Sequence, residues 1–230
     1  MNNRITLSKA MKLYNGRSMP EFILKMSLVS ICIYAVIIVY KVLMILLRGD
    51  GTEELQSEMA DNTLSSSFLL FSAGMISLVM SQLTFEKHMP GGKFFRTVKG
   101  GFDTYKKASA AICISKVAVV AILADFAMLL HISGIAPMRY GIAAPVTMFI
   151  FFTLAMGICN LFYMASDVSG NSLKSTFIAL IVFFIAGIAV AMNEDRLGKV
   201  HLIIAAVAAV LLPVSHIMLM KNYEKKRWKN

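Results

Sequence analysis

The sequence predicts an all-α polytopic membrane protein, and three observations lead to that class. Hydrophobic residues make up 57% of the 230-residue chain and charged residues only 16%, whereas soluble domains average about 45–50% and about 25%. The apolar residues gather in blocks of roughly twenty, the length at which a helix crosses about 30 Å of hydrocarbon. These blocks lack the alternating segments of about ten residues that build a membrane barrel.

The apolar runs long enough to span a bilayer number about six. Polar stretches such as "RGDGTEELQSEMADN" (48–62) and "NEDRLGKV" (193–200) separate them. The transmembrane domain therefore occupies residues 22–220. Its spans are predicted at about Phe22–Leu47, Ser65–Phe85, Ala108–His131, Gly141–Ser166, Leu173–Met192 and Val200–Met220.

Residues 1–21, before the first span, are predicted to form a cytoplasmic amphipathic segment. Within "RITLSKAMKLYNGRSMPEF" (4–22), Leu7, Met11 and Tyr14 share one face at helical spacing, whereas Lys9 and Lys12 lie off that face. A helix with an apolar face and basic flanks is typical of the membrane interface. We therefore expect an N-terminal interfacial helix.

The charge distribution predicts the orientation of the chain. The net charge is +10, and most Lys and Arg residues lie in the first segment, in the loop 86–107 and in the tail 221–230. The opposite side holds only Arg48, Arg139, Arg196 and Lys199, beside an acidic loop. Because Lys and Arg in short loops stay in the cytoplasm, both termini and the loop 86–107 are predicted to be inside. No folded basic domain is evident that would bind nucleic acid, so the positive charge indicates attraction to the lipid bilayer.

The loop 86–107 contains the most unusual stretch of the chain, "MPGGKFFRTVKGGFDTYKK" (89–107). Proline and glycine in "MPGG" end any helix that leaves the second span. The following "KFFRTVK" has room for about two helical turns, and Gly100-Gly101 interrupts the chain again. Asp103 is then expected to cap the third span, because its carboxylate can accept from free backbone N–H groups.

Aromatic residues beside arginine are typical of protein interfaces, so this loop is a candidate contact surface. Its candidate contact residues are Lys93, Phe94, Phe95, Arg96 and Lys99. The alternative is that the aromatic residues of the loop lie in the headgroup zone while the basic residues hold the loop inside. The residues alone leave both interpretations open.

Three residues within the predicted spans are candidates for a functional role. Lys41 and Asp125 each lie six residues before the outer end of a span, or about 9 Å along the helix. Opposite charges at equal depth predict an intramembrane ion pair, and the alternative is that each faces a wet cleft or extends alone to the interface. Pro213 is predicted to kink the sixth span near its inner end and to be a candidate hinge.

The stretch "MPGGKFFRTVKGGFDTYKKASAA" (89–111), with the amphipathic N-terminal segment and the layout of spans, resembles the type-2 ABC transporter permeases. These are the small six-span membrane subunits of bacterial exporters. The resemblance covers the whole chain in layout. One departure is that "NEDRLGKV" is too short for the pair of re-entrant helices that many members carry between spans five and six.

The resemblance implies a function and a set of partners. The chain would be an exporter permease in the bacterial plasma membrane, working as a homodimer or with a sibling permease. Residues 93–99 would form a coupling helix that docks on a separate ABC ATPase subunit. ATP and Mg would be bound by that ATPase, and this chain would bind no cofactor. The substrate stays open among peptides, lipids and drugs.

The chain shows no motif of a membrane enzyme. It lacks HExxH, GxSxG and clustered aspartates within the spans, and its three cysteines, Cys32, Cys113 and Cys159, lie in apolar runs without metal-ligand spacing. We therefore expect no intrinsic catalysis and no metal site. The alternative to a permease is a non-transporting membrane scaffold or sensor.

Overall fold

The computed structural model describes residues 5–48, 97–133, 143–165, 181 and 199–225. Every element within these residues is a helix, as the sequence predicts. The helices are α1 (Leu7–Asn15), α2 (Met19–Arg48), α6 (Gly101–Ile132), α7 (Ala143–Ala165) and α9 (Lys199–Tyr223).

Three of these helices contain segments long and apolar enough to cross a membrane. The segments are Met19–Val36 in α2, Gly101–Ile132 in α6 and His201–Tyr223 in α9. Helix α7 has 23 residues, with a shorter apolar segment at Pro145–Ile158. These four helices coincide with the predicted first, third, sixth and fourth spans. The predicted spans Ser65–Phe85 and Leu173–Met192 lie outside the described residues.

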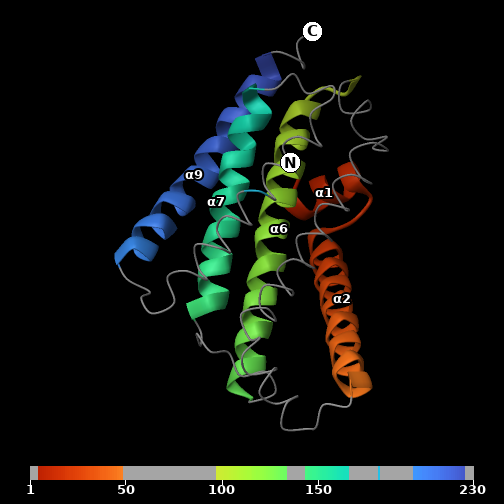
Figure 1. The fold of residues 1–230 in the computed structure, drawn as a ribbon. Helices are drawn as coiled ribbons and strands as arrows, with labels where there is room; N and C mark the ends of the chain where they lie inside the picture. The colour runs from red at the N-terminus through yellow and green to blue at the C-terminus, as the bar shows by residue number, and fades with distance from the viewer. Residues whose placement is uncertain (1–4, 49–96, 134–142, 166–180, 182–198, 226–230) are drawn as a thin grey trace.

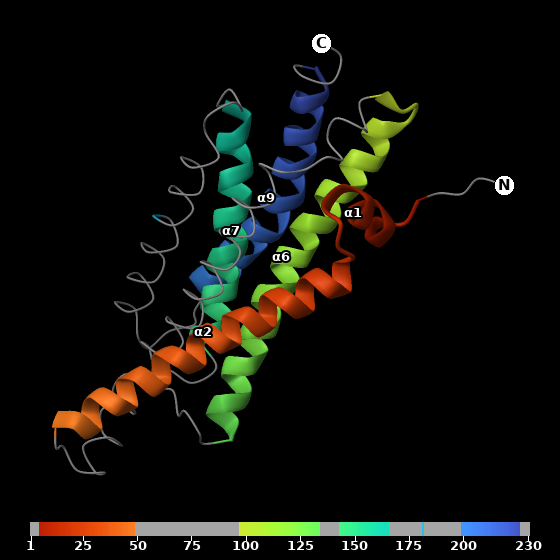
Figure 2. The same ribbon diagram turned by 90° about the vertical axis from the view of Figure 1, so that its right-hand side faces the viewer.

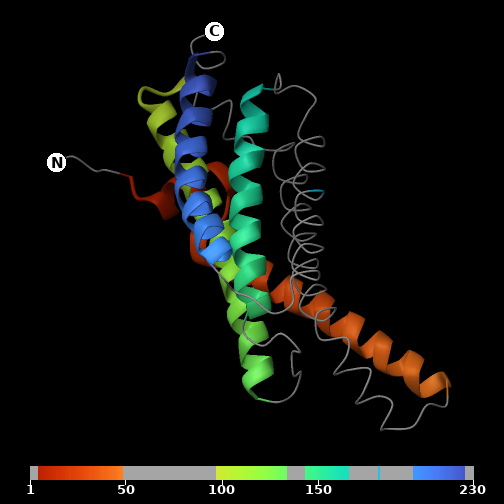
Figure 3. The same ribbon diagram turned by 60° about the vertical axis from the view of Figure 1, so that its left-hand side comes forward.

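Helix α6 is the centre of the described bundle. It contacts α1 and α2 on one side and α7 on the other, and α7 in turn packs along α9 (Figure 1). The colour gradient shows that α2 and α6 run in one direction, whereas α7 and α9 run in the opposite direction, side by side (Figure 3). The start of α6 and the end of α9 therefore lie at the same end of the bundle.

Helix α1 is short and has well-defined ends. Thr6 caps its start by accepting a hydrogen bond from the backbone N–H of Lys9, at 3.4 Å. Gly16 ends it in the left-handed conformation, with φ +70°, and donates its N–H to the carbonyl of Lys12 at 2.8 Å. Three residues after Gly16, α2 begins at Met19, whose N–H donates to the hydroxyl of Ser8 at 3.4 Å. These bonds fix the angle between α1 and α2.

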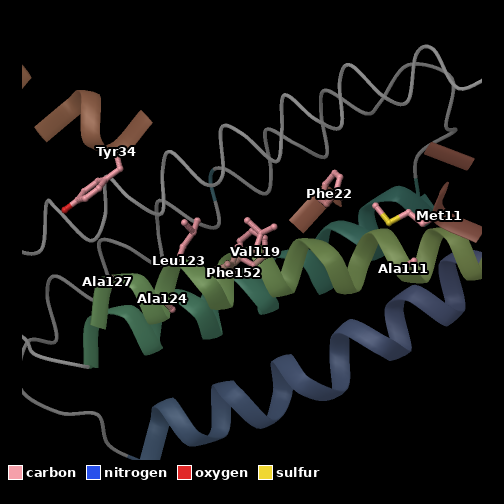
Figure 4. Packing of buried hydrophobic residues seen from close by; sticks show 10 residues of the cluster. Met11, Phe22, Tyr34, Ala111, Val119, Leu123, Ala124, Ala127 and Phe152 are labelled. Carbon is pink, nitrogen blue, oxygen red and sulfur yellow. The ribbon is translucent and has the colours of Figure 1, made fainter. Parts of the chain in front are cut away.

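The apolar face that the sequence assigns to α1 packs against α6. Met11 is fully buried and lies beside Ala111 (Figure 4). The side of α6 that receives it carries Ala108, Ala111 and Ser115, all fully buried, at helical spacing. Small side chains at such spacing allow a second helix to approach closely. Figure 2 shows α1 crossing α6 near the start of that helix.

The main apolar core continues down α6 from this crossing. Val119, Leu123 and Ala127 recur every four residues on one face and are buried against Tyr34 of α2 and Phe152 of α7 (Figure 4). Moving a side chain as large as valine or leucine from water into such a core contributes about 1.5–3 kcal/mol to stability. Between helices in lipid, association is driven by close packing instead. These buried residues therefore determine how α2 and α7 pack against α6.

Candidate functional site at the start of helix α6

Of the predicted loop 86–107, the structure describes residues 97–107. Thr97–Gly100 form a turn that leads directly into α6, and residues 101–107 are the first residues of that helix. The backbone N–H of Gly101 donates to the carbonyl of Val98 at 2.9 Å. Gly100 adopts φ +77°, a conformation that L side chains rarely take, so the predicted break in the chain occurs at Gly100. Lys99 is exposed on this turn. The other candidate contact residues, Lys93, Phe94, Phe95 and Arg96, lie outside the described residues.

Helix α6 begins earlier than its predicted apolar span and is not capped by Asp103. Gly100 is the N-cap residue and makes no side-chain cap bond, because glycine has no side chain to make one. Asp103 lies within the first turn, where a negative charge is favourable near the helix N-terminus. Its carboxylate pairs with Lys106, with Nζ 3.4 Å from Oδ1. The prediction that Asp103 is the N-cap is therefore wrong: the N-cap is Gly100, three residues earlier.

Tyr105 is the centre of an aromatic cluster formed by Tyr14, Phe102, Tyr105 and Tyr223. Its ring centroid lies 5.3 Å from that of Tyr14 on α1, in an edge-to-face arrangement at 75°. The ring of Tyr223, at the end of α9, stacks on it with centroids 5.2 Å apart. Phe102, one turn earlier on α6, stacks at 6.3 Å. Three segments far apart in the sequence therefore meet at one side chain.

Lysines strengthen the same junction. Lys106 Nζ lies 4.5 Å from the centroid of Phe102, within the range of a cation–π interaction. Lys107 Nζ donates to the backbone carbonyl of Ile5 at 3.0 Å, which ties the start of α1 to α6. From the sequence, these lysines are predicted only to keep the loop on the cytoplasmic side. In the structure Lys106 also contacts Phe102, and Lys107 also contacts Ile5.

The aromatic cluster was only partly accessible from the sequence. Phe102 and Tyr105 belong to the aromatic-rich loop, and Tyr14 belongs to the apolar face of α1. The sequence pattern therefore indicates a contact role for each of these three residues. Tyr223 lies in the basic stretch "KNYEKK", and no sequence pattern indicates a contact for it. What joins the three segments is the arrangement of α1, α6 and α9, and residue spacing does not contain that information.

The predicted pair of Lys41 and Asp125 stays a prediction. Helices α2 and α6 contact each other, as the pair requires, and Asp125 is exposed on α6. The side chain of Lys41 lies outside the described residues. The two helices diverge toward their ends at Arg48 and Ile132 (Figures 2 and 3).

Pro213 lies inside α9, close to two contacts with α7. Before the proline, Gly157 of α7 packs so closely that a Cβ added there would lie 3.0 Å from Leu211 Cγ. After it, Asn160 Nδ2 donates to the hydroxyl of Ser215 at 3.3 Å. That hydroxyl in turn donates to the carbonyl of Leu212 at 3.0 Å. The candidate hinge is therefore flanked by contacts with the neighbouring helix.

Within the part of the chain that the structure describes, no group of three or more His, Cys, Asp or Glu side chains is placed to hold a metal ion. Cys32 and Cys113 are free thiols on α2 and α6. The described side chains at the start of α6 provide aromatic stacking and positive charge, which are typical of a contact surface. No protein-family model, curated protein or solved structure matches this chain.

Proposed function

We propose that this chain is the membrane-spanning permease subunit of an ATP-driven exporter of the ABC type in the bacterial plasma membrane. The observation that carries the proposal is the junction at the start of α6. The predicted ATPase contact segment, 93–99, ends in the turn Thr97–Gly100, which leads directly into α6. The first turns of α6 contact α1 and α9 through the aromatic cluster. A force on the loop would therefore act on three helices.

The helix directions support a six-span layout. If α2 and α6 both cross the membrane in the same direction, the chain must return across it between them. The same holds for α7 and α9, which also share a direction (Figure 1). The predicted spans Ser65–Phe85 and Leu173–Met192 would supply those two returns. This count places both termini on one side, in agreement with the charge distribution.

The length of α6 supports a start beyond the hydrocarbon. Its 32 residues extend for about 48 Å, and even at a tilt of about 20° they would cover about 45 Å of a membrane whose apolar core is about 30 Å thick. The surplus at the first turns carries Asp103, Lys106 and Lys107, which are suited to the headgroup region. In this arrangement α1 lies at the cytoplasmic surface with its basic residues Lys9 and Lys12 exposed.

The proposed mechanism is a mechanical coupling. ATP and Mg bind to a separate ABC ATPase subunit, and closure of that subunit pushes on residues 93–99. Helix α6 then shifts together with α1 and the end of α9, and the bundle moves between inward-open and outward-open states. Two permeases, either identical or siblings, would enclose the transport path.

The experiment is a pull-down from the native host in mild detergent, read out by quantitative mass spectrometry. It compares the wild type with the triple variant Phe94→Ala, Phe95→Ala, Arg96→Ala. The matched control is Tyr40→Ala, Leu43→Ala, Leu47→Ala, at exposed positions of α2. We expect an ATPase subunit with the wild type and the control, and its loss from the triple variant.

Two outcomes would contradict the proposal. If no ATPase is recovered with the wild type, the non-transporting scaffold or sensor becomes the better interpretation, and the loop is then an interfacial segment. If an ATPase is recovered equally with a triple variant that remains folded, the contact lies elsewhere and residues 93–99 have no coupling role.

A further inference from the structure

Helix α9 is continuous from Lys199 to Tyr223 and contains Pro213, which removes one hydrogen bond from its backbone ladder. Pro213 has no backbone N–H to donate to the carbonyl of Ala209, and its ring crowds that carbonyl. The hydrogen-bond ladder is therefore weakest at this point, and the residues that follow can move as a separate unit. We infer that this segment, Val214–Tyr223, is a movable C-terminal arm whose position is set by the start of α6.

Contacts with α7 hold α9 on both sides of Pro213, at the base of the arm. The close contact of Gly157 with Leu211 holds the part of α9 that precedes Pro213. The hydrogen bond from Asn160 to Ser215 holds the first turn of the arm. The Ser215 hydroxyl accepts this hydrogen bond from α7 and donates its own to the carbonyl of Leu212, on the other side of the proline. Serine bonded to its own helix in this way favours bending.

The tip of the arm contacts α6 as well as continuing the helix α9. Tyr223 stacks on Tyr105 with centroids 5.2 Å apart, and Met220, one turn earlier, is buried. Tyr105 is itself fixed between Phe102 and Tyr14. The arm is thus attached at its base to α7 and at its tip to the second turn of α6.

This attachment makes the arm follow α6. A displacement of the first two turns of α6 carries Tyr105, and with it Tyr223, while the part of α9 before Pro213 stays with α7. The arm then bends at the proline. That a partner ATPase produces the displacement rests on the proposed function, whereas the existence of the arm does not.

The test measures distances between spin labels in the full chain, reconstituted alone in lipid nanodiscs. Cys32, Cys113 and Cys159 are first replaced by alanine. One label is placed at Leu24 of α2 and the other at either Lys221, in the arm, or Leu202, before the proline. All three positions are exposed, and α2 and α9 lie on opposite sides of α6 (Figure 1).

We expect Tyr105→Ala to widen the Leu24–Lys221 distance distribution roughly twofold, because the tip of the arm loses its partner. The Leu24–Leu202 distribution should stay as it is in the wild type. Tyr105→Phe keeps the ring and should preserve both distributions, which distinguishes loss of the stack from general unfolding. Adding Pro213→Ala to Tyr105→Ala should restore a narrow Leu24–Lys221 distribution, since alanine supplies the backbone N–H that proline lacks and completes the hydrogen-bond ladder of α9.

Equal widening of both distributions would overturn the inference, because α9 would then move as one body. No widening of either would also overturn it, because Tyr105 would then not set the position of the arm. The result is independent of the ATPase, which is absent from the nanodiscs. A failed pull-down combined with selective widening would therefore reject the proposed function and leave the arm in place.

Discussion

At the scale of single residues, the contacts that matter most join helices through small or planar groups. Tyr105 contacts aromatic rings from α1 and α9, and Ser115 lies under Met11, with Oγ 3.7 Å from Sδ. Gly157 is the third such residue, because its missing side chain lets α7 approach α9. In each case the identity of one residue decides how close two helices can come.

Gly157→Val is expected to destabilise the protein by about 1–3 kcal/mol through overpacking of the α7–α9 contact. A Cβ at this position would lie 3.0 Å from Leu211 Cγ and 3.3 Å from the backbone nitrogen of Leu212. Thermal unfolding in detergent measures the effect. Adding Leu211→Ala should recover part of the loss, because the nearest atoms belong to the Leu211 side chain. A double variant no more stable than Gly157→Val would show that the backbone contact dominates.

At the scale of helices, the sequence predicts which helices exist better than it predicts where each helix ends or what packs against it. Runs of apolar residues locate α2, α6, α7 and α9, because a membrane-crossing helix must be continuously apolar. They do not locate the start of α6 at Gly101, seven residues before the predicted Ala108, since the first turns are polar yet helical. The sequence also identifies the apolar face of α1, but periodicity cannot say whether lipid or another helix covers it.

The docking of α1 on α6 predicts different costs for the two faces of that helix. Met11→Ala should destabilise the protein by about 2–5 kcal/mol, because Met11 is fully buried against α6. Leu13→Ala should cost less than about 0.5 kcal/mol, since Leu13 is 52% exposed. Melting curves of the two variants in the same detergent provide the comparison. Similar losses from both would mean that α1 is held as much by its other face as by α6.

The predicted ion pair between α2 and α6 is tested by exchanging its charges. Lys41→Asp or Asp125→Lys alone should lower the melting temperature and the yield of folded protein, because a charge within the apolar region would lose its partner. The double exchange, Lys41→Asp with Asp125→Lys, should restore both quantities in large part. If the double variant is as unstable as the two single variants combined, the residues do not pair, and each faces water or the interface alone.

At the scale of the whole molecule, what the sequence could not supply is the way distant segments meet. The charge distribution predicts which side each loop occupies, because translocation is governed by Lys and Arg in short loops. It does not predict that α1, the start of α6 and the end of α9 converge on Tyr105. Composition and periodicity are local properties, whereas this junction depends on the packing order of the helices around α6.

The orientation itself gives the last prediction. With the native cysteines replaced by alanine, single cysteines are introduced at Lys12, Lys225 or Ser133, all of which are exposed. A membrane-impermeant maleimide added to intact cells should label only the Ser133→Cys variant, because Ser133 follows the end of α6 opposite to the basic junction. In inverted vesicles the pattern should reverse. Labelling of Lys225→Cys in intact cells would place the tail outside, and the start of α6, whose Tyr105 stacks on Tyr223, would then face away from any cytoplasmic ATPase. That single result would remove the basis for coupling through residues 93–99, whatever the pull-down recovered.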